Sequence, residues 1–189
     1  MAGGRGEDLA RKRAAVAEHY ETHFERVARY IAVRIGDSAE AEDLASEVFV
    51  RALRGVERYR ETGAPMVAWL FKIAHNITVD HLRSRGRRPV SVPLEEDDPA
   101  VGTIPASPLG NPGEELERQE EVRQLQYAME QLTEAQRHVL ALRFGSDMSS
   151  EEVAEVMGKR PGAVREMQSA GIKKLRQILS GLQAEAPGR

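Results

Sequence analysis

The sequence predicts an all-α protein in which a flexible acidic linker joins two small helical domains. Apolar residues recur every three or four positions over residues 14–88 and again over residues 114–182, which is the period of one helix face. Between these segments, residues 89–113 contain six prolines and a run of four carboxylates, and they keep no regular period. The first segment predicts three helices and the second about four, with the short connections of a helical bundle.

The composition is that of a soluble globular chain, with 189 residues of which 41% are hydrophobic and 30% charged. Because the chain has no cysteine, disulfides and thiolate metal sites are excluded. No apolar run reaches the length of a membrane span, and the first residues lack the hydrophobic region of a signal peptide. We therefore expect a cytoplasmic protein that needs no cofactor and no metal.

The net charge of −3 is distributed unevenly along the chain. Residues 1–88 carry 16 Lys and Arg against 13 Asp and Glu, and residues 122–189 carry 10 against 8. Residues 89–121 carry 1 against 9. The two predicted domains are thus mildly basic, so the acidic total does not exclude a nucleic-acid partner.

The N-terminal domain is expected to follow a Gly- and charge-rich segment, residues 1–12, that frays. An amphipathic helix then spans residues 14–35, and Gly36 interrupts it. A second helix starts near Ser38, with acidic residues in its first half and basic residues later, as the helix dipole favours. A loop at residues 59–65 precedes a third helix, which ends in a cluster of arginines.

Two capping boxes mark helix starts in the C-terminal domain. Thr133 is followed three residues later by Gln136, and Ser149 is followed by Glu152 at the same spacing. In a capping box each side chain binds a backbone N–H group that the first helical turn leaves free. Gly145 ends the helix that starts at Thr133.

The last two helices form a helix-turn-helix pattern. Gly158 lies where a helix end favours positive φ, and Pro161 is placed in the first turn of a long, partly basic helix that runs to Leu182. This arrangement is typical of proteins that insert the second helix into a DNA major groove. A plain pair of antiparallel helices with a solvated charged face is the alternative.

Four stretches resemble bacterial RNA polymerase sigma factors of the extracytoplasmic-function (ECF) group. They are Ala41–Ala52 and Ala68–Arg83 in the N-terminal domain, and Leu132–Arg137 and Ser150–Leu175 in the C-terminal domain. In that family the first stretch docks on core polymerase, and the second opens and reads the upstream-of-start promoter element. The C-terminal stretches read the distal element. The resemblance implies a region-two-like domain and a region-four-like domain with no folded domain between them.

The resemblance implies that the helix from Ser38 binds the clamp helices of core RNA polymerase through its polar face. It assigns this contact to Glu40, Asp43, Leu44, Glu47 and Arg51. The residues alone leave a simpler explanation open, in which the carboxylates only complement the helix dipole.

The third helix is implied to capture a base flipped out of the non-template strand, which requires a polar side chain that hydrogen-bonds a base edge. Asn76 is the candidate for that contact, and the arginines would bind phosphates in a salt-sensitive way. Trp69 is expected in the core rather than stacked on a base. The implied DNA-binding set is Tyr59, Lys72, Asn76, His81, Arg83, Arg85, Arg87 and Arg88.

The helix that begins at Pro161 is implied to read the distal promoter element. The residues assigned to DNA are Arg160, Gly162, Ala163, Arg165, Glu166, Ser169 and Lys173. Glu166, Gln168 and Ala170 make this helix less basic than in many family members. Gln168 also interrupts the apolar face, where we expect it to weaken packing.

Three classes of function are compared. A sigma factor implies as partners core RNA polymerase, promoter DNA (both duplex and melted non-template strand), and an anti-sigma factor. An autonomous helix-turn-helix regulator would bind a palindromic duplex without polymerase, and it leaves the helix over Asp43–Arg51 unexplained. An enzyme is disfavoured, because the only tempting cluster, His75, Asp80 and His81, does not share one helix face and there is no cysteine nucleophile.

Overall fold

The computed structural model describes residues 3–60, 65–87 and 112–185, and within these ranges the chain is all-α, as predicted. The predicted linker therefore lies outside the described residues, apart from its last two positions. The helical elements are α1 (Gly3–Ile35), α2 (Ser38–Gly55), the 3₁₀ turn η1 (Val56–Arg58), α3 (Met66–Arg87), α4 (Pro112–Glu130), α5 (Glu134–Leu140), the π turn η2 (Ala141–Gly145), α6 (Ser150–Met157) and α7 (Pro161–Glu185).

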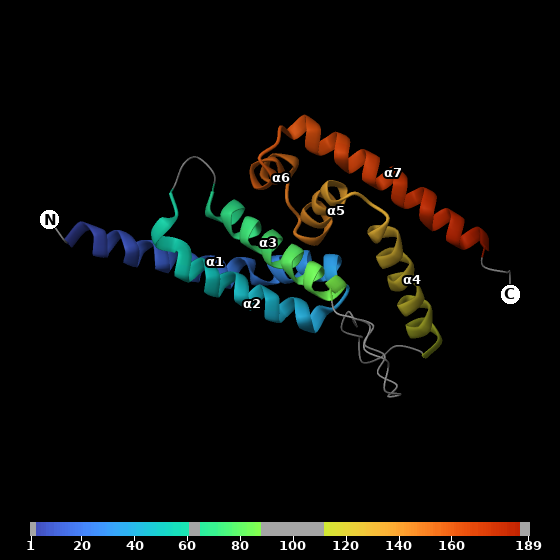
Figure 1. Ribbon diagram of the computed structural model, residues 1–189, viewed down its shortest axis with the longest axis horizontal. Coiled ribbons are helices and arrows are strands. Elements are labelled where there is room, and N and C mark those ends of the chain that lie inside the picture. Colours follow the sequence, from blue (N-terminus) through green and yellow to red (C-terminus); the bar gives the residue numbers. More distant parts are fainter. Residues whose placement is uncertain (1–2, 61–64, 88–111, 186–189) are drawn as a thin grey trace.

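The first three helices pack against one another, with α1 lying along both α2 and α3 (Figure 1). Their shared core includes Ile31 of α1, Val48 of α2 and Phe71 of α3, all of which are buried. The turn between α1 and α2 follows the predicted signals. Gly36 takes a φ of 78°, and the Asp37 carboxylate accepts a hydrogen bond from the backbone N–H of Glu40 at 2.9 Å.

Two helix starts differ from the prediction. The segment expected to fray is helical from Gly3 onward, so α1 is 33 residues long and Leu9 packs against the core. In addition, α4 begins at Pro112 rather than at Glu114. Proline is favoured in the first helical turn because its missing N–H would have no partner there.

In the C-terminal domain both predicted capping boxes are confirmed. The Thr133 hydroxyl accepts from the N–H of Gln136 at 3.3 Å, and the Ser149 hydroxyl accepts from the N–H of Glu152 at 3.1 Å. Gly158 adopts the left-handed conformation with φ of 62°, as predicted from its position at the end of α6. These local signals fix the angle at which α6 turns into α7.

We expect Ser149→Ala to lower the free energy of unfolding by about 1 kcal/mol, because one N–H of the α6 first turn loses its partner. Urea denaturation followed by circular dichroism measures this change. Ser180→Ala is the matched control, since Ser180 is exposed on α7. An equal loss in the two variants would contradict the capping role of Ser149.

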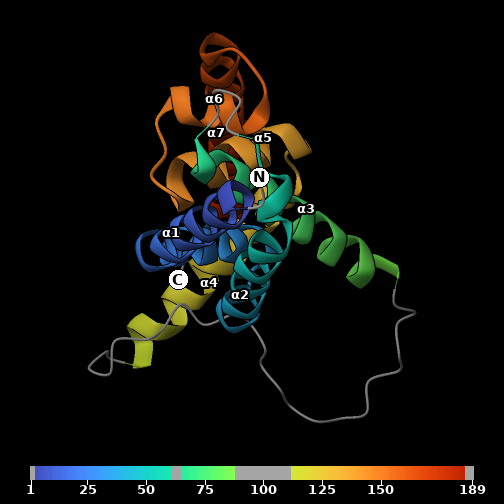
Figure 2. The same cartoon turned by 90° about the vertical axis from the view of Figure 1, so that its left-hand side faces the viewer.

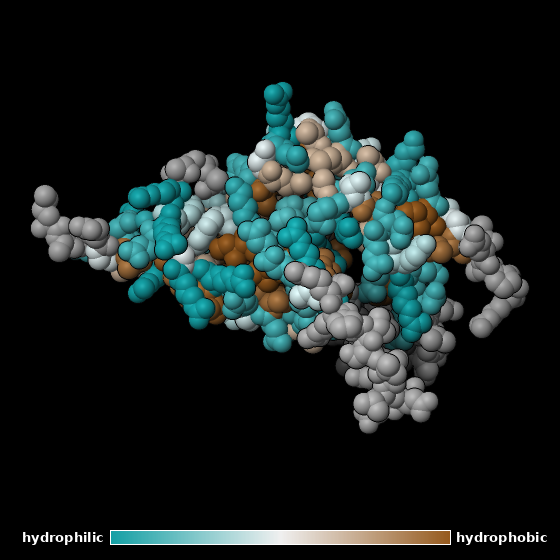
Figure 3. All heavy atoms as spheres, viewed as in Figure 1, coloured by the Kyte–Doolittle hydropathy of each residue, from teal (hydrophilic) through white to brown (hydrophobic). Residues whose placement is uncertain are grey.

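The two predicted domains do not stand apart within the described chain. In Figures 1 and 2, α5, η2 and α6 lie against α1 and α3, and one hydrophobic cluster runs through both domains. Val27 of α1 and Leu142 of η2 are both fully buried in this cluster. A smaller cluster formed by Met129, Leu132 and Leu140 joins α4 and α5, and α7 packs on it. The solvent face in Figure 3 is mostly hydrophilic, with small hydrophobic patches.

Candidate functional site

The outward face of α2 carries both charged and apolar side chains. Ala41, Ala45 and Val48 turn into the core, which leaves Asp43 on the exposed side. On the same helix, Val50 is 38% exposed and Leu53 is 43% exposed. Exposed apolar residues ringed by charges are typical of a protein-binding surface.

The other residues predicted on the outward face of α2 differ in their contacts with neighbouring side chains. Arg51 donates from Nε to the Glu47 carboxylate at 2.7 Å, one turn away on α2. Leu44 is half-buried and packs against the core, so it supports this surface more than it forms it. Glu40 is turned toward α3, where its Oε2 lies 3.3 Å from Arg85 Nη1 and 3.3 Å from His81 Nε2.

The polar stripe predicted on α3 is present. Lys72 and Asn76 are exposed one turn apart, and Asp80 continues the stripe 4.0 Å from Arg83. The Tyr59 ring is half-buried and lies 5.1 Å from the Trp69 ring, centroid to centroid. Trp69 packs against the core, as expected, and thereby holds Tyr59 beside the N-terminal end of α3.

The end of α3 is tied to α2 by ion pairing. Arg85 and His81 both approach Glu40, so residues assigned to DNA and to polymerase meet at this one carboxylate. The side chain of Arg87 and all of Arg88 lie outside the described residues.

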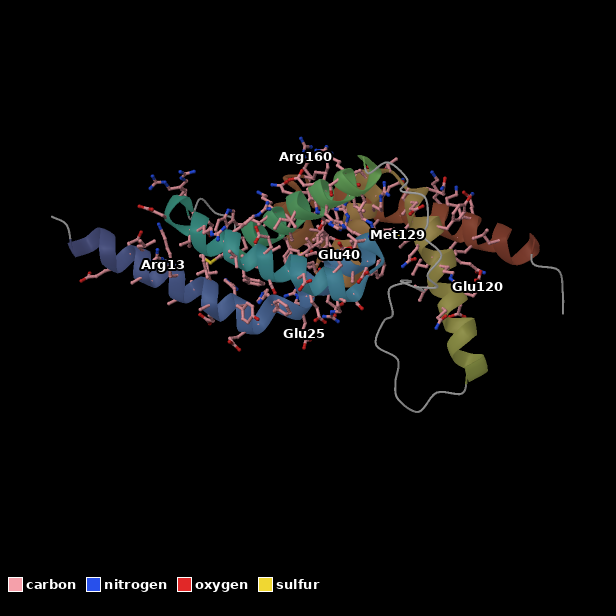
Figure 4. The ribbon with its side chains drawn as sticks, turned by 60° about the horizontal axis from the view of Figure 1, so that its bottom comes forward. Arg13, Glu25, Glu40, Glu120, Met129 and Arg160 are labelled. Carbon is pink, nitrogen blue, oxygen red and sulfur yellow. The ribbon has the colours of Figure 1, made fainter. Side chains whose placement is uncertain are left out.

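The N-terminal half of α7 carries the third surface. Arg165, Gln168, Ser169, Ile172, Lys173, Arg176 and Gln177 line a shallow groove along this helix. Of these, Arg176 and Gln177 lie outside the predicted set, although both continue the polar face by one more turn. Arg160, Gly162 and Glu166 are exposed, whereas Ala163 is half-buried. Figure 4 shows Arg160 on the opposite side of the molecule from Glu25 of α1.

Arg165 is oriented by two contacts. Its Nε donates to the backbone carbonyl of Pro161 at 3.3 Å, and its Nη2 lies 3.7 Å from Glu151 of α6. Because the ion pair is largely exposed, it is weak, and the guanidinium can exchange it for a phosphate.

Gln168 has a hydrogen-bonded partner that the sequence did not predict. Its Oε1 accepts a hydrogen bond from Arg143 Nε at 3.2 Å, and Arg143 also donates to the backbone carbonyl of Met148. The amide therefore connects α7 to the turn before α6. Gln168 lies on the apolar face, as expected, and its amide makes a part-buried hydrogen bond to η2 there.

A polar cluster that the sequence did not reveal lies between the two domains. Arg34 of α1 has a buried side chain that pairs with Glu134 of α5. Arg34 Nη1 also donates to the Tyr30 hydroxyl at 2.8 Å and to His75 Nδ1 at 3.0 Å. The His75 ring stacks on His138 of α5 with centroids 4.0 Å apart.

Burial sets the ionisation of this cluster. It raises the pKa of Tyr30 to about 12. Burial, with the neighbouring His75 and Arg34, lowers the pKa of His138 to about 2. Burial and the Arg34 guanidinium also lower the pKa of His75. His75 Nδ1 accepts from a guanidinium, which can only donate, so the His75 ring is neutral. The low pKa of His138 keeps that ring neutral at pH 7 as well.

The three residues weighed as an enzymatic cluster are engaged separately. His75 contacts His138, His81 approaches Glu40, and Asp80 approaches Arg83. Across the described ranges no group of three or more His, Asp or Glu side chains is arranged to hold a metal ion. The helices in those ranges are also too short or too polar to cross a membrane.

Comparison with known protein families places both halves of the chain. Residues 17–88 match the family described as Sigma-70 region 2, and residues 128–177 match the family described as Sigma-70, region 4. The first match contains α2 and α3, and the second contains the helix-turn-helix. An all-α protein with these two regions in this order has the layout of a transcription initiation factor.

Similarity to individual sigma factors shows which group of transcription initiation factors the chain resembles. The chain is 34% identical over 160 residues to the ECF RNA polymerase sigma factor BldN of Streptomyces coelicolor, covering 85% of this chain and 58% of the relative. It is 31% identical over 176 residues to the ECF RNA polymerase sigma factor SigD of Mycobacterium tuberculosis, covering 90% of this chain and 79% of the relative. The chain therefore belongs to the ECF sigma factors of RNA polymerase.

Solved structures share the fold. CnrH, in complex with the cytosolic domain of CnrY, aligns with a TM-score of 0.64 at 20% identity, over 92% of this chain and 95% of that chain. The sigma factor RpoE of Bartonella quintana, in complex with the anti-sigma factor NepR, aligns with a TM-score of 0.61 at 22% identity, over 87% and 96%. These likenesses establish the two-domain helical architecture.

Proposed function

We propose that this chain binds core RNA polymerase, directs it to a promoter and helps to melt that promoter, acting without catalysis of its own. The observation that carries the proposal is the presence of three separate exposed surfaces on the elements that the two sigma families cover. They lie on α2, on α3 and on α7.

The α2 surface fits a protein partner. Asp43 is exposed without an ion-pair partner among the described residues, whereas Glu47 and Arg51 neutralise each other. A free carboxylate beside the exposed side chains of Val50 and Leu53 offers one charge and an apolar patch to core polymerase. A partner with a basic side chain next to an apolar groove would match this surface.

The α3 surface fits a melted strand. Asn76 offers both a donor and an acceptor to a base edge, and Lys72 lies one turn away to neutralise a phosphate. Flipping a base costs a few kcal/mol, which contacts to the captured base offset. Promoter melting would thus draw on binding free energy, with no nucleotide hydrolysis.

The α7 surface fits a duplex. Arg165, Ser169 and Lys173 lie along one groove-lining face, and Arg176 extends it toward the C-terminus. An arginine or lysine can contact guanine or phosphate in the major groove, and the Glu166 carboxylate can accept from cytosine. With few cations on this helix, distal-element binding should be moderate and only weakly dependent on salt.

Regulation by an anti-sigma factor is part of the proposal. RpoE shares the fold of this chain, and its structure is that of a complex with the anti-sigma factor NepR. The exposed apolar residues of α2 give such a regulator a surface that it could cover in competition with core polymerase. We place the protein in the cytoplasm, where both partners would be met.

In vitro transcription tests the proposal against an autonomous regulator. Purified chain, core polymerase and a library of bacterial promoter fragments should give discrete run-off transcripts that need both protein components. Tight binding of the free chain to a palindromic duplex, together with no transcript from any fragment, would favour the autonomous regulator instead.

A further inference from the structure

Gln168 lies at the boundary between the buried side of α7 and the groove on its outer side. It lines that groove together with Arg165, Ser169 and Lys173, the residues assigned to duplex DNA. Successive residues of an α-helix are offset by about 100°, so Gln168 lies about 60° around the helix axis from Arg165. The side chain is therefore close enough to the DNA-facing side of α7 to take part in its contacts.

One end of the Gln168 amide is already engaged within the protein. Arg143 Nε donates a hydrogen bond to Gln168 Oε1 at 3.2 Å. A guanidinium carries donors only, so the atom that faces Arg143 must be the amide oxygen and not the amino nitrogen. The chemistry of Arg143 thus determines which way round the amide lies, a choice that the shape of a glutamine leaves open.

Arg143 is itself held in place from the other side. Its Nη1 donates to the backbone carbonyl of Met148, and the Met148 side chain is fully buried in the hydrophobic core. Two hydrogen bonds from one planar guanidinium leave it little freedom to turn. Arg143 is therefore a positioning residue that holds the Gln168 amide in one orientation before any ligand binds, which lowers the entropic cost of binding.

The amino group of Gln168 is left for an acceptor outside the protein. Within the described chain Nε2 has no hydrogen-bond acceptor, and it is not one of the buried polar atoms that lack a partner there. The amino group consequently reaches solvent with two N–H donors. Because the oxygen is turned toward Arg143, the end of the amide that the groove meets carries donors only.

We propose that Arg143 makes Gln168 a donor-only reader of the promoter duplex. This inference rests on the proposed sigma function. In the major groove guanine presents two acceptors, thymine one acceptor, adenine an acceptor and a donor, and cytosine a donor alone. The fixed amino group therefore hydrogen-bonds a guanine and meets only a second donor at a cytosine. A glutamine that is free to rotate would instead suit adenine, through both ends of its amide.

Transcription by the complete holoenzyme tests this reading. Fragments that the wild-type chain and core polymerase transcribe are prepared with each base pair of the distal element replaced in turn by the other three. At one base pair the wild type should discriminate between guanine and cytosine by about 5-fold, because one hydrogen bond is gained at guanine and lost at cytosine. Gln168→Leu removes the amide and should lose the preference at this base pair alone.

Gln168→Glu is the sharpest variant, because it keeps an oxygen toward Arg143 and replaces the amino group with a second oxygen. The groove then meets an acceptor, which matches the cytosine amino group. The base pair that the wild type transcribes least at this position should become the one that the variant transcribes best. Gln177→Glu makes the same charge change further along the groove and should lower transcription from all fragments evenly.

Arg143→Met tests the positioning role. Without the guanidinium the amide rotates and offers either end to the groove, so the preference at the Gln168 base pair should weaken while the other preferences remain. Circular dichroism checks that all the variants keep their helices.

Two results would overturn the inference. One is a set of base preferences in Gln168→Glu that stays unchanged at every base pair, as in Gln177→Glu. The other is an unchanged preference at the Gln168 base pair in Arg143→Met, which would remove the positioning role. A wild-type chain that gives no transcript from any fragment would instead overturn the proposed function, so the two failures are distinguishable.

Discussion

Replacing Asn76 with alanine should reduce the formation of open promoter complexes by about 10-fold or more and leave core polymerase binding unchanged. The side chain is exposed on α3, and alanine removes both its donor and its acceptor. Side-chain contacts to one base edge contribute about 1–3 kcal/mol, and 1.4 kcal/mol corresponds to about tenfold. Permanganate reactivity of thymines in the melted region measures the open complex.

The matched control is Ser84→Ala, which changes an exposed residue two turns further along α3. Open-complex formation in this variant should equal that of the wild type. Lys72→Ala should differ from both, because loss of a phosphate contact weakens DNA binding more at low salt than at high salt and makes binding less dependent on salt. Unchanged melting in Asn76→Ala would remove this residue from the proposed base contact.

Lowering the pH from 7.5 to 5.5 should lower the free energy of unfolding by about 1.4 kcal/mol for the titration of one histidine. Burial lowers the pKa of His138 to about 2 in the folded chain, whereas an exposed imidazole has a pKa of about 6.5. Below that ordinary value the unfolded chain binds a proton that the folded chain does not bind. The stabilisation is thus fully present above about pH 6.5 and is lost progressively as the pH falls.

The groups that face His138 act on the same transition. His75 also has a lowered pKa and adds to the effect, and the fixed positive charge of Arg34 opposes protonation of both rings. Urea denaturation followed by circular dichroism at each pH measures the change. In His138→Gln the loss of stability between pH 7.5 and 5.5 should be smaller; a loss equal to that of the wild type would contradict the role of this ring.

Local signals in the sequence predicted much of the fold. Thr133, Ser149, Gly158 and Pro161 each act on their own turn of backbone, so a pattern of three or four residues suffices to place a helix end. The same reasoning failed at Gly3, where a glycine- and charge-rich segment continues α1. The packing of Leu9 against the core outweighs weak intrinsic helix propensity there.

Contacts between distant residues could not be predicted in this way. Arg34 ends an amphipathic helix, where a basic residue already complements the helix dipole, so nothing in its surroundings points to Glu134, 100 residues later. In the sequence, Gln168 is likewise only a polar residue that interrupts an apolar helix face. The structure shows that Arg143 lies beside it and donates a hydrogen bond to it. The exposed residues Asp43, Asn76 and Ser169 were placed correctly on their helix faces, because periodicity alone determines the face.

Binding to core polymerase tests the central claim most directly. Purified chain should co-elute with core RNA polymerase in size-exclusion chromatography, and Asp43→Arg should reduce this binding by about 10-fold or more, since reversing an exposed charge at an interface costs over 1 kcal/mol. Glu25→Arg makes the same charge change on the far side of α1, and it should co-elute like the wild type (Figure 4). Absence of co-elution for the wild type, or equal co-elution of Asp43→Arg and Glu25→Arg, would contradict the assignment of the α2 face to polymerase.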